Sequence, residues 1–199
     1  AALAFTSFTA KEVIQSVAQV RGEFQQLEVA MNTMLGSKEK ADQMMTEMTT
    51  LAATTPFDLK SVAGGAKQLL AYGFEAEKVS DTLRRLGDVA AGLSINLGDL
   101  TYLYGTTMAQ GRLYTQDLNQ FTNRGIPMIQ ELAKQFGVAD SEVKKLVEEG
   151  KVGFPEVQKV IESLTNEGGK FGGLMEAQSH TIVGQWSNIQ DSIDMALNE

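Results

Sequence analysis

The chain has 199 residues, 43% of them hydrophobic, with a formal net charge of -8. This composition can fill a core, which excludes a disordered tail. The acidic balance argues against specific or non-specific nucleic-acid binding and against docking on an anionic membrane, since both need clustered lysine and arginine. The chain has no cysteine, which excludes disulfides, cysteine-ligated zinc and cysteine nucleophiles. It contains no apolar stretch of about 18 residues that would predict a transmembrane helix.

A long first helix is predicted from the capping-box pattern Thr9-Ala10-Lys11-Glu12. Apolar residues then recur at alternating spacings of four and three, which favours a narrow stripe that pairs with another helix. Gly36 ends this helix and Ser37 caps a second one, so residues 1–56 are predicted to form a helical hairpin. The stripe consists of Val13, Val17, Val20, Phe24, Leu27, Met31 and Met34.

The same hairpin is rich in methionine. Methionine-rich surfaces can adapt to partners, but methionine also fills ordinary helical cores. We favour the core interpretation and leave the partner surface open. The residues concerned are Met31, Met34, Met44, Met45 and Met48.

Residues 57–173 are predicted to form a core of short helices. Pro56 disfavours helix at Thr55, and Asp58 is a candidate N-cap for the next helix. Pro127 and Pro155 lie where a first-turn proline is expected. We predict helices at about 59–72, 76–92, 97–110, 115–123, 127–136, 141–149 and 155–167. Glycines are expected to end them, at Gly73, Gly92, Gly111, Gly125, Gly137, Gly150 and Gly168.

A second stripe with the same spacing occupies the last segment, 174–199. The predicted fold is therefore all-α, with short glycine-punctuated helices flanked by two long amphipathic, heptad-patterned helices. The two stripes can pair with each other, which we favour, or with another chain. The pattern is still running at Glu199 and the chain lacks an initiator methionine, so we expect a longer parent protein. The second stripe consists of Ile182, Trp186, Ile189, Ile193 and Ala196.

Residues that could carry catalysis are sparse. His180 is the single histidine, and a zinc site needs three or four ligands. The carboxylate pairs lie on predicted helix ends or exposed faces beside lysine or glutamine, which favours solvated surfaces over acid–base catalysis. We therefore predict no catalytic, metal or cofactor-binding residue. The pairs are Glu75 and Glu77, Glu148 and Glu149, and Asp191 and Asp194.

Two glycine clusters lack the spacing of a phosphate-binding loop. In residues 168–173, Phe171 stands where a magnesium-binding serine or threonine would be needed, and neither cluster follows a strand. We predict that residues 168–173 form a flexible joint and that Gly64-Gly65 allows a close approach between helices.

The run from Gly111 to Val138, with Arg124-Gly125-Ile126-Pro127 at its centre, resembles the signature of the N-terminal domain of phage tail tape measure proteins. In this motif Gly125 can take a positive φ, Ile126 can enter the core and Pro127 can begin a new helix, so it sets a corner. The resemblance covers about residues 25 to 197. Its flanking segments are TTPFDL (54–59), KQLLAYGF (67–74), VKKLVEEGKVGFPEV (143–157) and GQWSNIQDSID (184–194).

The resemblance implies a structural, non-enzymatic protein of the phage or prophage tail that acts in tail assembly and tail-length determination. It implies tail assembly chaperones, the tail tube protein and the baseplate hub as partners. It also implies a location in the tail interior of the virion, after assembly in the host cytoplasm. Two alternatives stay open: a helical coiled-coil adaptor or secreted interaction protein, and an all-α cell-wall hydrolase. Self-association through the stripes is a further possibility.

Overall fold

The computed structural model describes residues 10–179, with side chains from residue 21 onward. This part of the chain folds into ten helices without a named strand, and one isolated antiparallel bridge joins Arg112 to Gly153. The all-α prediction is confirmed. The helices are α1 (Ala10–Leu35), α2 (Lys38–Ala53), α3 (Leu59–Ala71), α4 (Ala76–Leu93), α5 (Leu97–Gln110), α6 (Thr115–Asn123), α7 (Met128–Phe136), α8 (Asp140–Glu148), α9 (Phe154–Thr165) and α10 (Leu174–Ser179).

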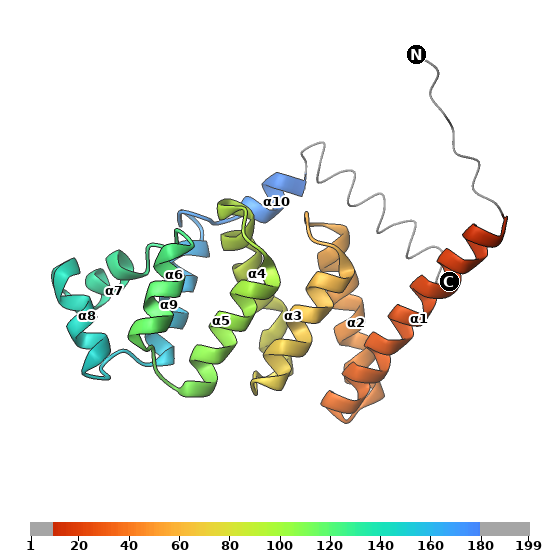
Figure 1. The fold of residues 1–199 in the computed structure, drawn as a ribbon, viewed down its shortest axis with the longest axis horizontal. Helices are drawn as coiled ribbons and strands as arrows, with labels where there is room; N and C mark the ends of the chain where they lie inside the picture. Colours follow the sequence, from red (N-terminus) through yellow and green to blue (C-terminus); the bar gives the residue numbers. More distant parts are fainter. Residues whose placement is uncertain (1–9, 180–199) are drawn as a thin grey trace, which may run out of the picture.

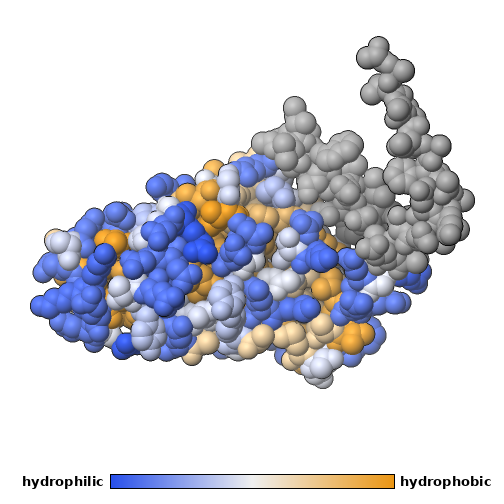
Figure 2. Space-filling view, in the orientation of Figure 1, coloured by the Kyte–Doolittle hydropathy of each residue, from blue (hydrophilic) through white to orange (hydrophobic). Residues whose placement is uncertain are grey.

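The helices stack along the long axis of the molecule, with α1 at one end and α7 and α8 at the other (Figure 1). Helix α1 contacts α2, α2 contacts α3, and α3 contacts α5. Helices α4 and α9 form a second layer, and α10 returns to pack on α4. A single hydrophobic core runs through the stack from Met31 to Phe171. Hydrophilic residues, drawn in blue, cover much of the face of this stack that Figure 2 shows.

Local capping explains why the predicted helix limits agree with the structure to within two residues. The Ser37 hydroxyl accepts a hydrogen bond from the Lys40 N–H at 3.4 Å, at the start of α2. The Asp58 carboxylate accepts from the Ser61 N–H at 2.8 Å, at the start of α3. Such side chains satisfy backbone donors that the first helical turn leaves free. The predicted cap at Thr9 lies outside the described residues.

Gly92 does not end α4, so that prediction is wrong. The helix continues to Leu93, and Ser94 takes the left-handed conformation at φ +54°. A Cβ atom at Gly92 would lie 2.6 Å from a Leu174 methyl carbon and 2.7 Å from a Phe171 ring carbon. This glycine therefore permits close packing against the segment before α10 instead of turning the chain.

The segment from 168 to 173 is a packed turn, which corrects the predicted flexible joint. The Phe171 side chain is buried in the core, and its N–H donates to the Leu164 carbonyl at 2.8 Å. A Cβ atom at Gly169 would lie 2.6 Å from the carbonyl oxygens of Ser163 and Leu164. The glycines thus let the chain fold tightly over the end of α9.

The methionine cluster of the hairpin is mainly core. Met34 is exposed on α1, and the other four are buried between the first helices, as the favoured interpretation had it. The buried methionines are Met31, Met44, Met45 and Met48.

In the part of the chain that the structure describes, no helix combines the length and apolarity that crossing a membrane requires. The domain boundaries placed after residues 56 and 173 stay predictions.

Candidate functional site

A groove of about 380 Å³ lies between α4, α5 and α9 and is the main candidate binding site. Three aromatic rings form its apolar part. Tyr104 lies 5.0 Å from Phe154 and 5.8 Å from Phe74, measured between ring centroids, and Phe74 lies 5.8 Å from Phe154. Aromatic rings at these separations pack favourably on one another, which fixes the shape of this surface. The groove is lined by Gly73, Phe74, Glu75, Glu77, Lys78, Asp81, Thr82, Arg85, Tyr104, Met108, Phe154, Gln158, Ile161 and Glu162.

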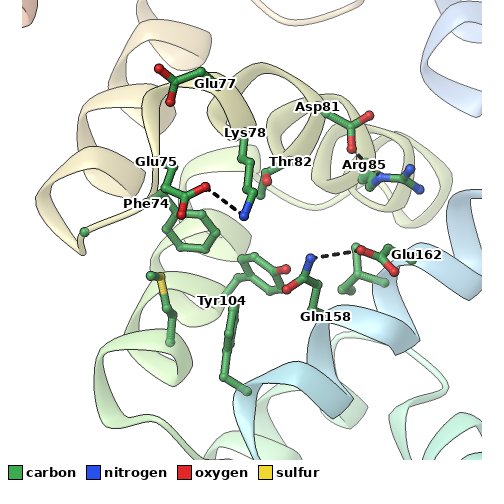
Figure 3. A pocket seen from close by; sticks show the side chains of 14 residues that line it. Phe74, Glu75, Glu77, Lys78, Asp81, Thr82, Arg85, Tyr104, Gln158 and Glu162 are labelled. Atoms are coloured by element: carbon green, nitrogen blue, oxygen red, sulfur yellow. Dashed lines mark hydrogen bonds and ion pairs between the residues drawn. The ribbon is translucent and has the colours of Figure 1, made fainter. Parts of the chain in front are cut away.

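Charged side chains of α4 and the residues before it form one rim of the groove. Lys78 pairs with Glu75 at 2.7 Å, and Arg85 donates to Asp81 at 2.7 Å (Figure 3). Arg85 also donates to the side-chain oxygen of Asn166 at 2.7 Å, which ties α4 to the end of α9. Burial would raise the pKa of Asp81, but the hydrogen bonds from Arg85 and Arg84 outweigh it and lower this pKa below its usual value. Asp81 is therefore poorly suited to act as a general acid.

Tyr104 is the most buried polar residue of the groove, with 2% of its surface exposed. Burial raises the pKa of its hydroxyl well above the usual value, so the group stays protonated. Among the described residues this hydroxyl has no hydrogen-bond partner. Figure 3 places Tyr104 in the middle of the groove, with Lys78 on one side and Gln158 and Glu162 on the other.

Glu162 lies opposite the charged rim, on α9, and is half-buried. Its carboxylate accepts a hydrogen bond from the Gln158 side-chain amide at 2.9 Å. No lysine or arginine of the described residues lies within ion-pair distance of it. The groove therefore offers a carboxylate without a basic partner, beside a neutral hydroxyl and an aromatic surface. This arrangement can bind a positively charged group.

The predicted solvated carboxylates lie on the surface next to lysines. Lys40 pairs with Glu77 at 3.3 Å, and Lys151 pairs with Glu149 at 2.7 Å. Asp191, Asp194 and His180 lie outside the described residues. Within residues 10–179, no three histidine or acidic side chains are grouped so as to hold a metal ion.

Neither glycine cluster forms a phosphate-binding loop in the structure. Gly64 and Gly65 lie within α3, and a Cβ atom at Gly65 would lie 2.8 Å from a Leu83 methyl carbon. The predicted close approach between helices is confirmed for Gly65, whereas a Cβ atom at Gly64 would meet open space.

The Arg124-Gly125-Ile126-Pro127 motif lies between α6 and α7. Gly125 takes φ +85° and its N–H donates to the Thr122 carbonyl at 2.9 Å, while the Ile126 N–H donates to the Phe121 carbonyl at 3.2 Å. These two bonds form a Schellman motif, which satisfies carbonyls at the end of α6. The Ile126 side chain is buried.

The two outer residues of this motif lie at the ends of helices. Arg124 donates from its guanidinium to the Gln120 carbonyl at 3.0 Å, one turn back in α6. Pro127 is the N-cap of α7, one position before the first helical turn where we expected it. The Glu131 N–H donates to the Pro127 carbonyl at 3.0 Å, so the proline still begins the helical hydrogen-bond pattern.

Most of the described part of the first stripe faces its own domain, and Met34 is the exception because it is exposed. Phe24 and Leu27 are half-buried against the core, and Met31 is fully buried, where α1 contacts α2 and α3. Pairing between the two stripes stays a prediction. The side chains of Val13, Val17 and Val20, and the residues Ile182, Trp186, Ile189 and Ile193, lie outside what the structure describes.

Asp117, in the first turn of α6, is a buried carboxylate that sequence reasoning missed. This residue is only 6% exposed, and one of its carboxylate oxygens is buried without a hydrogen-bond partner. Burial raises the pKa of Asp117 above its usual value of 3.8, partly opposed by a hydrogen bond from the Tyr114 backbone. The ionised form therefore destabilises the folded state.

We expect Asp117→Asn to stabilise the protein in a pH-dependent way. The cost of the charge is absent below the unfolded pKa of 3.8 and complete above the raised folded pKa. The stability gain of the variant over the parent chain should therefore grow from about pH 3 to about pH 7, as measured by urea unfolding. Asp99→Asn is the matched control, because Asp99 holds the same third position of α5 and is exposed. A gain that does not change with pH would contradict the prediction.

A family model described as tape measure protein matches residues 15–199 of the chain. No curated protein and no solved structure matches the chain.

Proposed function

The chain belongs to the tape measure protein family, and from this premise we propose that it is a structural module acting in the assembly of a phage tail and in setting tail length. The observation that carries the proposal is the family match over residues 15–199, which includes the Arg124-Gly125-Ile126-Pro127 corner and every described helix after the start of α1. A tape measure protein is a structural component of the phage tail, and we propose that this module has no catalytic role.

The stacked fold supports a structural role. Its helices pack side by side along one axis, and its hydrophobic core is continuous through the stack. A helix gains about 1.5 Å per residue, so helical chains convert residue number into length. We propose that the chain joins such a helical ruler in the tail interior after assembly in the host cytoplasm. Tail assembly chaperones, the tail tube protein and the baseplate hub are the proposed partners.

An in-frame deletion of residues 57–157 in the parent phage or prophage tests the proposal. Particles are imaged by electron microscopy after induction, and we expect tailless heads or tubes of irregular length. The control carries Val29→Asp, a change on the exposed face of α1 that leaves the core intact. Normal tails of normal length in the deletion phage would refute the role in assembly. Bacterial wall clearing by the purified chain would instead favour the hydrolase alternative.

A further inference from the structure

We propose that the groove between α4, α5 and α9 is a docking site for a lysine or arginine side chain carried by a segment of a partner protein. The inference needs only the contacts within the groove and does not depend on the role in tail assembly. Three observations carry it: the balance of charge around the groove, the unpartnered hydroxyl of Tyr104 and the aromatic rings beside it.

The charge of the groove is complementary to a cation. Its two positive side chains, Lys78 and Arg85, already pair with carboxylates at 2.7 Å, and Glu162 on the opposite side has no basic partner among the described residues. Acidic groups outnumber basic ones, so an anionic ligand would be repelled. An incoming ammonium or guanidinium group would compensate the charge of Glu162. The acidic lining residues are Glu75, Glu77, Asp81 and Glu162.

Tyr104 supplies a polar contact inside the groove. Because its hydroxyl is neutral and has no partner among the side chains that the structure describes, its oxygen can accept a hydrogen bond from a guanidinium or ammonium N–H. A wholly apolar side chain would bury this hydroxyl and the Glu162 carboxylate without compensation, which is unfavourable. The groove is therefore better matched to a side chain that is apolar along its stem and positive at its tip.

The aromatic part of the groove fits the stem and the charge of such a side chain. Tyr104 and Phe154 lie edge to face at 5.0 Å, with Phe74 at 5.8 Å from each. Cations bind favourably over aromatic faces, and the methylene stems of lysine and arginine pack on apolar surfaces. The groove is open to solvent along one side, so a side chain attached to a protein segment can enter it.

Peptide binding to the 199-residue chain tests the proposal. The probe is a capped heptapeptide, Gly-Ala-Leu-Arg-Leu-Ala-Gly, and its matched controls carry citrulline or glutamate in place of arginine. Citrulline keeps the shape of arginine and removes its charge. Binding is followed by the shifts of backbone amide signals in ¹⁵N NMR. We expect the arginine peptide to bind at least about fivefold more tightly than the citrulline peptide, with shifts centred on α5 and α9.

Two variants locate the binding in the groove. Glu162→Gln should weaken binding of the arginine peptide about fivefold, and Tyr104→Phe should weaken it by a smaller factor while keeping the ring. Glu148→Gln removes the same charge from the exposed surface of α8 and should leave the affinity unchanged. Equal binding of the arginine and citrulline peptides, no binding at millimolar concentration, or an equal effect of Glu148→Gln would each overturn the proposal. The readout involves no phage, so its failure leaves the tail role untouched.

Discussion

Replacing Ile126 with aspartate should lower the free energy of unfolding by more than about 4 kcal/mol, enough to unfold many domains of this size. Ile126 is buried at the corner between α6 and α7, directly after the left-handed Gly125. The substitution removes an apolar side chain from the core and places a carboxylate there, where ionisation is costly. Urea unfolding monitored by circular dichroism measures the effect.

The matched control is Val29→Asp, which makes the same kind of change on α1. Val29 is 65% exposed, so we expect its replacement to change stability by no more than about 0.5 kcal/mol. If Ile126→Asp were tolerated as well as Val29→Asp, the corner would not contribute to the core. A large effect at Ile126 alone would show that this turn contributes to stability through packing in the core.

Replacing Asp88 with alanine should cost about 2–4 kcal/mol, because it removes the acceptor that holds α10 against α4. Asp88 is 2% exposed, and its carboxylate accepts hydrogen bonds from the Met175 N–H at 3.0 Å and the Gly173 N–H at 3.3 Å. The Arg84 guanidinium lies 3.8 Å away and balances the charge. Without the carboxylate, the N–H groups of Gly173 and Met175 lose their acceptor. They either remain buried without a hydrogen bond or become exposed to water, which disrupts the packing of α10 on α4.

Amide hydrogen exchange separates a local loss of α10 from general unfolding. We expect the amides of Gly173 and Met175 to lose protection in the Asp88→Ala variant while those of α7 and α8 keep theirs. Asp42→Ala is the control, since Asp42 pairs with Lys38 on the exposed surface of α2 and such pairs contribute little. Unchanged protection at residues 173–175 would show that Asp88 does not hold α10.

Features set by neighbouring residues were predictable from the sequence. Ser37 and Asp58 begin helices because their side chains reach backbone groups three positions ahead, and Gly125 turns the chain because a glycine accepts a positive φ. The prediction that Gly92 ends a helix is wrong because a glycine can permit either a turn or a close contact. The contact that decides between them, with Leu174, lies more than 80 residues away in the chain.

The groove could not be predicted, because its parts come from distant segments. Phe74, Tyr104 and Phe154 belong to three different parts of the chain and carry no shared spacing. In the sequence, Glu162 resembles any other acidic residue on a helix. Only the fold shows that no lysine or arginine within its described part pairs with it. Conversely, Met44 and Met48 were ambiguous by composition, and burial against α1 resolved them as core. These features depend on contacts between helices that are distant in the sequence, which a local pattern does not contain.

The return of α10 to α4 also orders the events of synthesis. The chain segment of the α1–α2 hairpin is complete once residue 53 has been made. Asp88, by contrast, meets its partner at Met175 only after 87 more residues have been added, a wait of roughly 4 to 17 s at common rates of translation. Through that interval its carboxylate is hydrated, and the surface of α4 that α10 will cover is open to water. Helix α10 therefore completes a part of the core that α4 began.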